Sequence, residues 1–225
     1  MHANAHGFAI GPGFTELAIF DRQRQPSPNE RAAKYGLRRE GSARRLRRSI
    51  FEAIFMTPEH TRAMARYNRW MNDKLYAVAE KLTDEERKKD RGAFFGSIHR
   101  TLNHLLVADR IWLGRFTGAA LAEGEMGPGG IRSLDQELYA DFDELRRERA
   151  RTDDELDAFV ATLTAEKLAG SLRYLRRGVV NEFPLWHAVA HLFNHQTHHR
   201  GQVTTLLMQA GHDPGVTDLL AMLRG

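Results

Sequence analysis

Four long stretches between residues 56 and 225 carry apolar residues at helical spacing, and this pattern restricts the fold of the chain most. They run from Thr57 to about Leu82, from Phe94 to Phe116, from Ser133 to Leu163 and from Pro184 to about Ala210. Amphipathic helices with modest connections bury their apolar faces against one another. The pattern therefore predicts an all-α fold, a four-helix bundle over residues 56–225.

Start and stop signals support the first, second and fourth helices. Thr57 offers an N-cap oxygen, and Pro58 and Glu59 are favoured in a first turn. Gly118 and Gly211 follow the second and fourth stretches, as glycine often does at helix ends. We expect these three helices close to the stated bounds.

The third stretch and the connections are less regular. Ser133, followed by Gln136 and Glu137, predicts a helix start at that serine, with a break near Thr152. Residues 118–130 predict a glycine-rich loop, and residues 169–183 a loop or small hairpin. A last short helix is expected over residues 218–223.

Residues 1–55 differ from the rest in charge. They hold ten of the 33 basic residues and five of the 29 acidic ones, so the net charge of +4 comes from this segment. We interpret it as an irregular basic extension with a short amphipathic helix over residues 37–55. A disordered tail, a targeting peptide and a nucleic-acid arm are alternatives. The abrupt change at Met56 favours the hypothesis that Met56 is the native start and that the extension is not part of the native product.

Composition excludes several classes of function. Without cysteine the chain has no disulfide, no thiolate zinc site and no cysteine nucleophile, so any metal must be held by His, Asp or Glu. The near-neutral body lacks a basic stripe, so we expect no direct nucleic-acid binding. No apolar run is long enough to span a bilayer, which predicts a cytoplasmic protein without membrane contact.

Five of the eleven histidines lie within thirteen residues of the fourth predicted helix: His187, His191, His195, His198 and His199. Positions four apart lie within about 40° of each other around a helix. His195 and His199, or His191 and His195, can therefore present two imidazoles to one metal ion.

A third ligand must come from another helix, and the second predicted helix offers His99 and His104. His104 has apolar neighbours, Leu102, Leu105 and Leu106, which indicates that it faces inward. A buried imidazole without a partner is costly, and a metal ion or a hydrogen bond removes that cost. Spacing alone leaves both histidines open.

Three motifs resemble the DinB family of damage-inducible, YfiT-like metalloenzymes. Residues 194–202 (NHQTHHRGQ) resemble the last bundle helix of that family, residues 101–112 (TLNHLLVADRIW) its second helix and residues 67–72 (YNRWMN) its first. Their order and spacing are family-like, and the resemblance covers residues 56–225. It implies a DinB/YfiT-like up-down-down-up bundle, often a homodimer, of a DNA damage-inducible stress-response protein.

By the same resemblance, His104, His195 and His199 are the ligands of one divalent metal ion. Zinc, nickel and iron are candidates, since imidazole suits all three. His191 falls outside this triad, and we expect it to line the pocket or to serve as an additional ligand. His198 also falls outside it, and we expect it to support a ligand or to lie on the surface.

The resemblance implies a metal-dependent thiol S-transferase that uses a low-molecular-weight thiol such as bacillithiol or mycothiol. The alternatives are a metal-dependent hydrolase and a non-catalytic metal-binding stress protein. The sequence identifies no catalytic base. Asp109 lies about 140° around the helix from His104, so it is expected to support packing or a neighbouring helix. The polar and aromatic residues of the first motif are expected either to line the bundle or its interface or to serve packing alone: Tyr67, Asn68, Trp70 and Asn72.

Overall fold

The computed structural model describes residues 56–121, 124–176 and 178–224. The predictions for residues 1–55, including the amphipathic helix and the start at Met56, lie outside the described residues. The elements are α3 (Pro58–Ala79), α4 (Asp84–Lys88), α5 (Ile98–Thr117), α6 (Phe142–Ala161), α7 (Ala165–Ala169), β1 (Ser171–Arg176), β2 (Val179–Pro184), α8 (Leu185–Gln209) and α9 (Leu219–Arg224).

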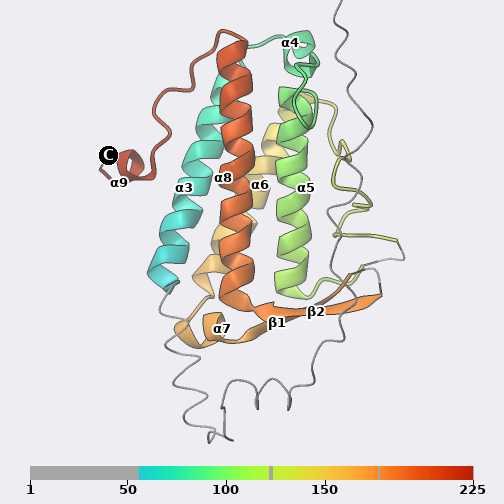
Figure 1. Cartoon of the computed structure of the whole chain (residues 1–225), viewed down its shortest axis with the longest axis vertical. Helices are drawn as coiled ribbons and strands as arrows, with labels where there is room; N and C mark the ends of the chain where they lie inside the picture. Colours follow the sequence, from blue (N-terminus) through green and yellow to red (C-terminus); the bar gives the residue numbers. More distant parts are fainter. Residues whose placement is uncertain (1–55, 122–123, 177, 225) are drawn as a thin grey trace, which may run out of the picture. The chain divides into compact units, whose positions relative to one another are not determined.

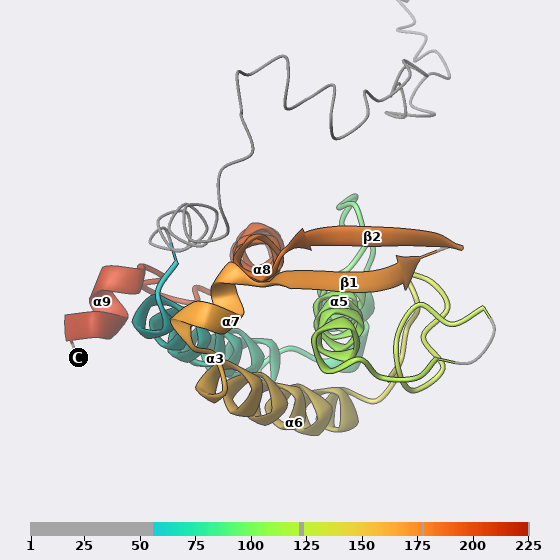
Figure 2. The ribbon, with the colours of Figure 1, turned by 90° about the horizontal axis from the view of Figure 1, so that it is seen from below.

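Four long helices pack side by side. Helix α3 packs on α6 and α8, and α5 packs on the same two helices. Figure 1 shows α3 and α8 running in one direction and α5 and α6 in the other, and the end-on view of Figure 2 shows the four arranged as a ring. The all-α prediction is thus right in its main part, with a small sheet added. Of the described helices, none is long and apolar enough to cross a membrane.

The predicted caps set the first helix. The Thr57 side chain accepts a hydrogen bond from the backbone N–H of His60, and Pro58 occupies the first helical position. Helix α5 begins later than expected, at Ile98, with Ser97 as its N-cap. The prediction of Phe94 was wrong because Gly96 has a φ of 77°, which a right-handed helix cannot include.

Helix α6 also begins later than expected. Its N-cap is Asp141, and residues 133–140 are not helical. Asn103 of α5 explains this, because its side-chain oxygen accepts hydrogen bonds from the backbone N–H groups of Leu138 and Tyr139, at 2.9 and 3.0 Å. The predicted break at Thr152 is absent, since α6 is continuous there.

The predicted hairpin is present. Strands β1 and β2 pair antiparallel, with Tyr174 opposite Asn181, and Gly178 at the turn has a φ of 74°. The hairpin leads directly into α8 and contacts both α5 and α8 (Figure 2). The long connection between α5 and α6 joins two helices that run in the same direction (Figure 1).

The described core consists of three apolar clusters, of which the smallest contains Val107, Ile111 and Ile131. Of the two larger ones, one is formed where α3 and α8 end and α5 and α6 begin and includes Leu75, Leu106 and Leu145, and the other lies at the opposite ends of these helices and includes Leu156 and Phe193. Polar side chains occupy the level between the two larger clusters, and these polar side chains position the candidate site.

Candidate metal centre

Three histidines meet where α5 faces α8. The Nε2 atom of His104 lies 3.2 Å from Nε2 of His195 and 3.2 Å from Nε2 of His199. One nitrogen from each ring lies within 4.8 Å of the others. His195 and His199 are one turn apart on α8, and the packing of α5 on α8 brings His104 between them.

Hydrogen bonds on the far side of two rings fix where the protons lie. Nδ1 of His104 is 2.7 Å from the carbonyl oxygen of Leu134, and Nδ1 of His199 is 2.8 Å from the side-chain oxygen of Gln202. Both oxygens can only accept, so each Nδ1 carries the proton and each Nε2 presents a lone pair. The Gln202 amide nitrogen lies 3.4 Å from a ring nitrogen of His198, which agrees with this orientation.

This arrangement fits a divalent metal ion. The Nε2 lone pairs of His104 and His199 face each other at 3.2 Å and repel, and a shared cation removes the repulsion. Two nitrogen ligands about 2.05 Å from a tetrahedral zinc ion lie about 3.3 Å apart. The hydrogen bonds at Nδ1 of His104 and His199 are the usual way in which a protein orients a histidine ligand. His104, His195 and His199 could therefore hold the ion, as the sequence predicted; that role stays a prediction.

Burial keeps the three imidazoles neutral. His104 is 4% exposed, and burial lowers its pKa to about 4, with the nearby His199 acting in the same direction. Burial, together with the neighbouring histidines, lowers the pKa of His195 to about 3. The pKa of His199 is also lowered, mainly by burial. At neutral pH all three are in the form that binds metal.

The other histidines lie outside this group. His99 is fully buried, and its Nε2 lies 2.9 Å from the carbonyl oxygen of Tyr139, so the geometry selects His104 over His99. His191 is exposed, with its ring centre 5.0 Å from that of Trp112 and 6.1 Å from that of His195.

Sequence reasoning missed three supports of the site. Phe95 stacks on His104 with ring centres 3.9 Å apart, and the Leu134 carbonyl holds the same ring. Both come from segments predicted as helix, and no sequence signal indicates these contacts. Gln202 was detectable, because a residue three positions after His199 lies on the same face of the helix.

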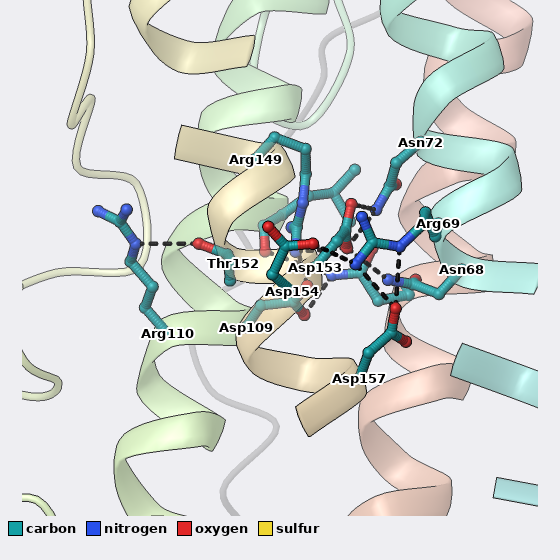
Figure 3. A network of polar contacts seen from close by, with 12 residues as sticks. Asn68, Arg69, Asn72, Asp109, Arg110, Arg149, Thr152, Asp153, Asp154 and Asp157 are labelled. Carbon is teal, nitrogen blue, oxygen red and sulfur yellow. Dashed lines mark hydrogen bonds and ion pairs between the residues drawn. The ribbon is translucent and has the colours of Figure 1, made fainter. Parts of the chain in front are cut away.

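A second buried polar cluster joins all four long helices, and we call it the Arg149 network (Figure 3). Arg149 pairs with Asp109 at 2.8 Å and with Asp153 at 2.9 Å. Asp153 also accepts hydrogen bonds from Asn68 and Asn72. Asp109 thus serves a neighbouring helix, as expected. The members are Asn68, Asn72, Asp109, Arg149, Asp153, Gln196 and Arg200.

The network also ties α8 to the rest of the fold at the level of the histidines. Gln196, next to His195, donates a hydrogen bond to Asp109 on α5. Arg200, next to His199, donates one to Asn68 on α3. Both side chains are at least 98% buried. These contacts set the position of α8 relative to α5, on which the meeting of the histidines depends.

Comparison with known proteins identifies the family. Protein DinB of Bacillus subtilis (strain 168) is 23% identical over 152 residues, covering 68% of this chain and 87% of that protein. A crystal structure of a DinB-like protein from Bacillus cereus ATCC 10987 is 23% identical, with a TM-score of 0.49, and covers 66% of this chain and 91% of that chain. The model of the DinB family matches residues 56–225, which is most of the chain. The chain therefore belongs to the DinB family.

Proposed function

We propose that this chain is a metal-dependent enzyme of the thiol S-transferase type, built on a DinB-like four-helix bundle. The convergence of the Nε2 atoms of the three histidines at the α5–α8 contact carries the proposal. His104, His195 and His199 would hold one divalent ion, with zinc, nickel and iron as the candidates. Bound there, the ion would supply Lewis acidity that favours the ionised form of a thiol near neutral pH.

The donor set supports a thiol as the co-substrate. The three imidazoles are neutral, and in the part of the chain that the structure describes no carboxylate joins the group, so the site favours an anionic ligand. The chain has no cysteine, so the thiol must come from a small molecule. In the transfer, sulfur forms a bond to an electrophilic carbon, the leaving group departs with its electron pair, and the thiol proton passes to solvent.

The rest of the site serves orientation and exclusion of water. Leu134 and Gln202 fix the rings of His104 and His199 through Nδ1, and Phe95 covers the face of His104. A homodimer is part of the proposal by resemblance to the family, and light scattering of the full chain measures it.

Elemental analysis of the purified protein tests metal binding first. We expect about one divalent ion per chain, at least a tenfold loss in His195→Ala, and no loss in the control His198→Ala, whose ring is exposed. Helical circular dichroism should be unchanged in both variants. A metal-free wild type, or equal metal content in all three proteins, would contradict the site.

Thiol consumption tests the reaction. Metal-loaded protein is incubated with monochlorobimane and, in turn, bacillithiol, mycothiol, glutathione and cysteine. We expect at least one thiol to react faster than with His195→Ala. Ester hydrolysis without thiol consumption would replace the transferase with a hydrolase, and inertness in both assays would favour a metal-binding protein without catalysis.

A further inference from the structure

A second site lies beyond the candidate metal centre, between the last turns of α5, the connection that follows it, and β1. The cavity has a volume of about 760 Å³, in the range of small-molecule pockets. Ile111, Met126 and Pro128 supply apolar walls. Its lining also contains four arginines: Arg115, Arg132, Arg173 and Arg176.

The arginines of this cavity are largely without carboxylate partners. Arg173 lies 3.5 Å from Glu182. For the other three, no carboxylate lies within ion-pair distance in the described ranges 56–121, 124–176 and 178–224. Glu125 is the one acid among the described lining residues. The described lining residues therefore carry a net positive charge.

In a neighbouring cavity, by contrast, the lining arginines do have carboxylate partners. It has a volume of about 1040 Å³ and is lined by Arg110 and Arg151 among others. Both of these arginines pair with Glu148, Arg151 at 3.0 Å. There the fold supplies the counter-charge, whereas at Arg115 it supplies none among the described residues.

Arg115 is held in place by aromatic rings. Its guanidinium carbon lies 4.5 Å from the ring centre of Trp112 and 4.5 Å from that of Tyr174. Cation–π contacts of this kind stabilise the position of the guanidinium, and they do not use its N–H groups as donors to an oxygen atom. Arg115 is half-buried, and a partly desolvated charge gains from an anionic partner.

We propose that this cavity binds a small organic anion, a carboxylate or phosphate monoester on an apolar body. Arg115 makes the main contact, with Arg132 and Arg176 beside it, and the apolar walls take the body of the ligand. Arg115 lies eleven residues after His104, about 16 Å along α5, so the site is separate from the metal centre and does not depend on it.

Calorimetric titration of the full chain tests the proposal, with benzoate, phenyl phosphate and neutral benzyl alcohol as probes. We expect binding of at least one anion, weaker at high salt, and none of the alcohol. Arg115→Gln should weaken binding at least tenfold, and the control Arg151→Gln, in the neighbouring cavity, by less than twofold. Benzoate and phenyl phosphate distinguish a carboxylate from a phosphate ligand.

Because Arg115→Gln could lose binding by misfolding, a second variant tests the same cavity without changing Arg115. The double variant Arg132→Gln, Arg176→Gln changes two exposed side chains, so it should fold normally and still lose affinity several-fold. No heat of binding at millimolar probe, or equal affinity in all variants, would overturn the proposal. If a single-stranded oligonucleotide binds more tightly than benzoate and phenyl phosphate, and if this binding depends on the arginines, the cavity is part of a nucleic-acid site and the proposal of a small-anion site is wrong. The titrations are done with and without a metal chelator. Anion binding that is equal in both conditions does not depend on the proposed metal centre, so the two proposals are tested separately.

Discussion

The histidine group and the Arg149 network lie at neighbouring levels of α5 and α8, and both bury polar side chains, yet they differ in what completes them. In the network, Arg149 lies between Asp109 and Asp153, so positive and negative groups meet inside the chain. In the histidine group, three neutral imidazoles converge, and no carboxylate of the described residues joins them. In the network the fold itself supplies the counter-charges of Arg149, whereas the cation that we propose for the histidine group would come from outside the chain.

The pKa values of the Arg149 network and of the histidine group also differ, because their neighbours differ in charge. Burial alone would lower the pKa of Arg149, but the carboxylates of Asp153 and Asp109 outweigh it and raise that pKa. For His104 and His195, burial lowers the pKa and neighbouring imidazoles lower it further. Arg149 therefore stays charged, and the histidines stay neutral. Buried polar groups that satisfy one another indicate a structural role, and like groups that converge indicate a ligand site.

The largest expected effect comes from breaking the network. Arg149→Met leaves two buried carboxylates without their counter-charge, so the free energy of unfolding should fall by about 3–5 kcal/mol. Urea denaturation followed by circular dichroism measures it. The control Arg62→Met removes an exposed pair with Glu59 and should cost less than about 1 kcal/mol. Equal losses in the two variants would mean that the network contributes no more than a surface pair.

The second largest expected effect is a loss of stability at acidic pH that depends on His104. The ordinary pKa of histidine is about 6.5, and that of His104 in the fold is about 4. Between these values the unfolded chain binds more protons, so stability is full above pH 6.5 and is lost as the pH falls toward 4. From pH 7 to pH 5, metal-free wild type should lose about 2 kcal/mol more than His104→Asn. Parallel pH profiles of the two proteins would show that His104 is not held neutral by burial.

The smallest expected effect is the contribution of Gln202 to metal affinity in the histidine group. Gln202→Ala removes the acceptor of His199 Nδ1–H, and zinc affinity should fall by about tenfold while the fold is unchanged. Competition with a chromogenic chelator measures this affinity. Thr205→Ala, an exposed change on the same helix, is the matched control and should leave zinc affinity unaltered. An unchanged affinity in Gln202→Ala would mean that helix α8 alone orients the ring of His199.

Local signals predicted much of the fold. The Thr57 cap, the glycine that follows α5 and the hairpin at Gly178 all act over a few residues, and the structure has them. Errors arose where a distant residue decides the local backbone. Asn103 binds the backbone N–H groups of Leu138 and Tyr139, which a helix from Ser133 would have used within itself, and no local pattern records such a contact.

The sequence by itself determined that any metal must bind nitrogen or oxygen ligands, and that His195 and His199 share one face of a helix. Both follow from residue type and helical geometry alone. Spacing left His99 and His104 open, the family resemblance favoured His104, and the tertiary structure shows that His104, and not His99, meets this pair. That choice depends on how α5 packs against α8 and on the carbonyls of Leu134 and Tyr139, which take one histidine each. The reason is physical: a periodic pattern records the face of a helix, while contacts between helices depend on the packing of the whole core.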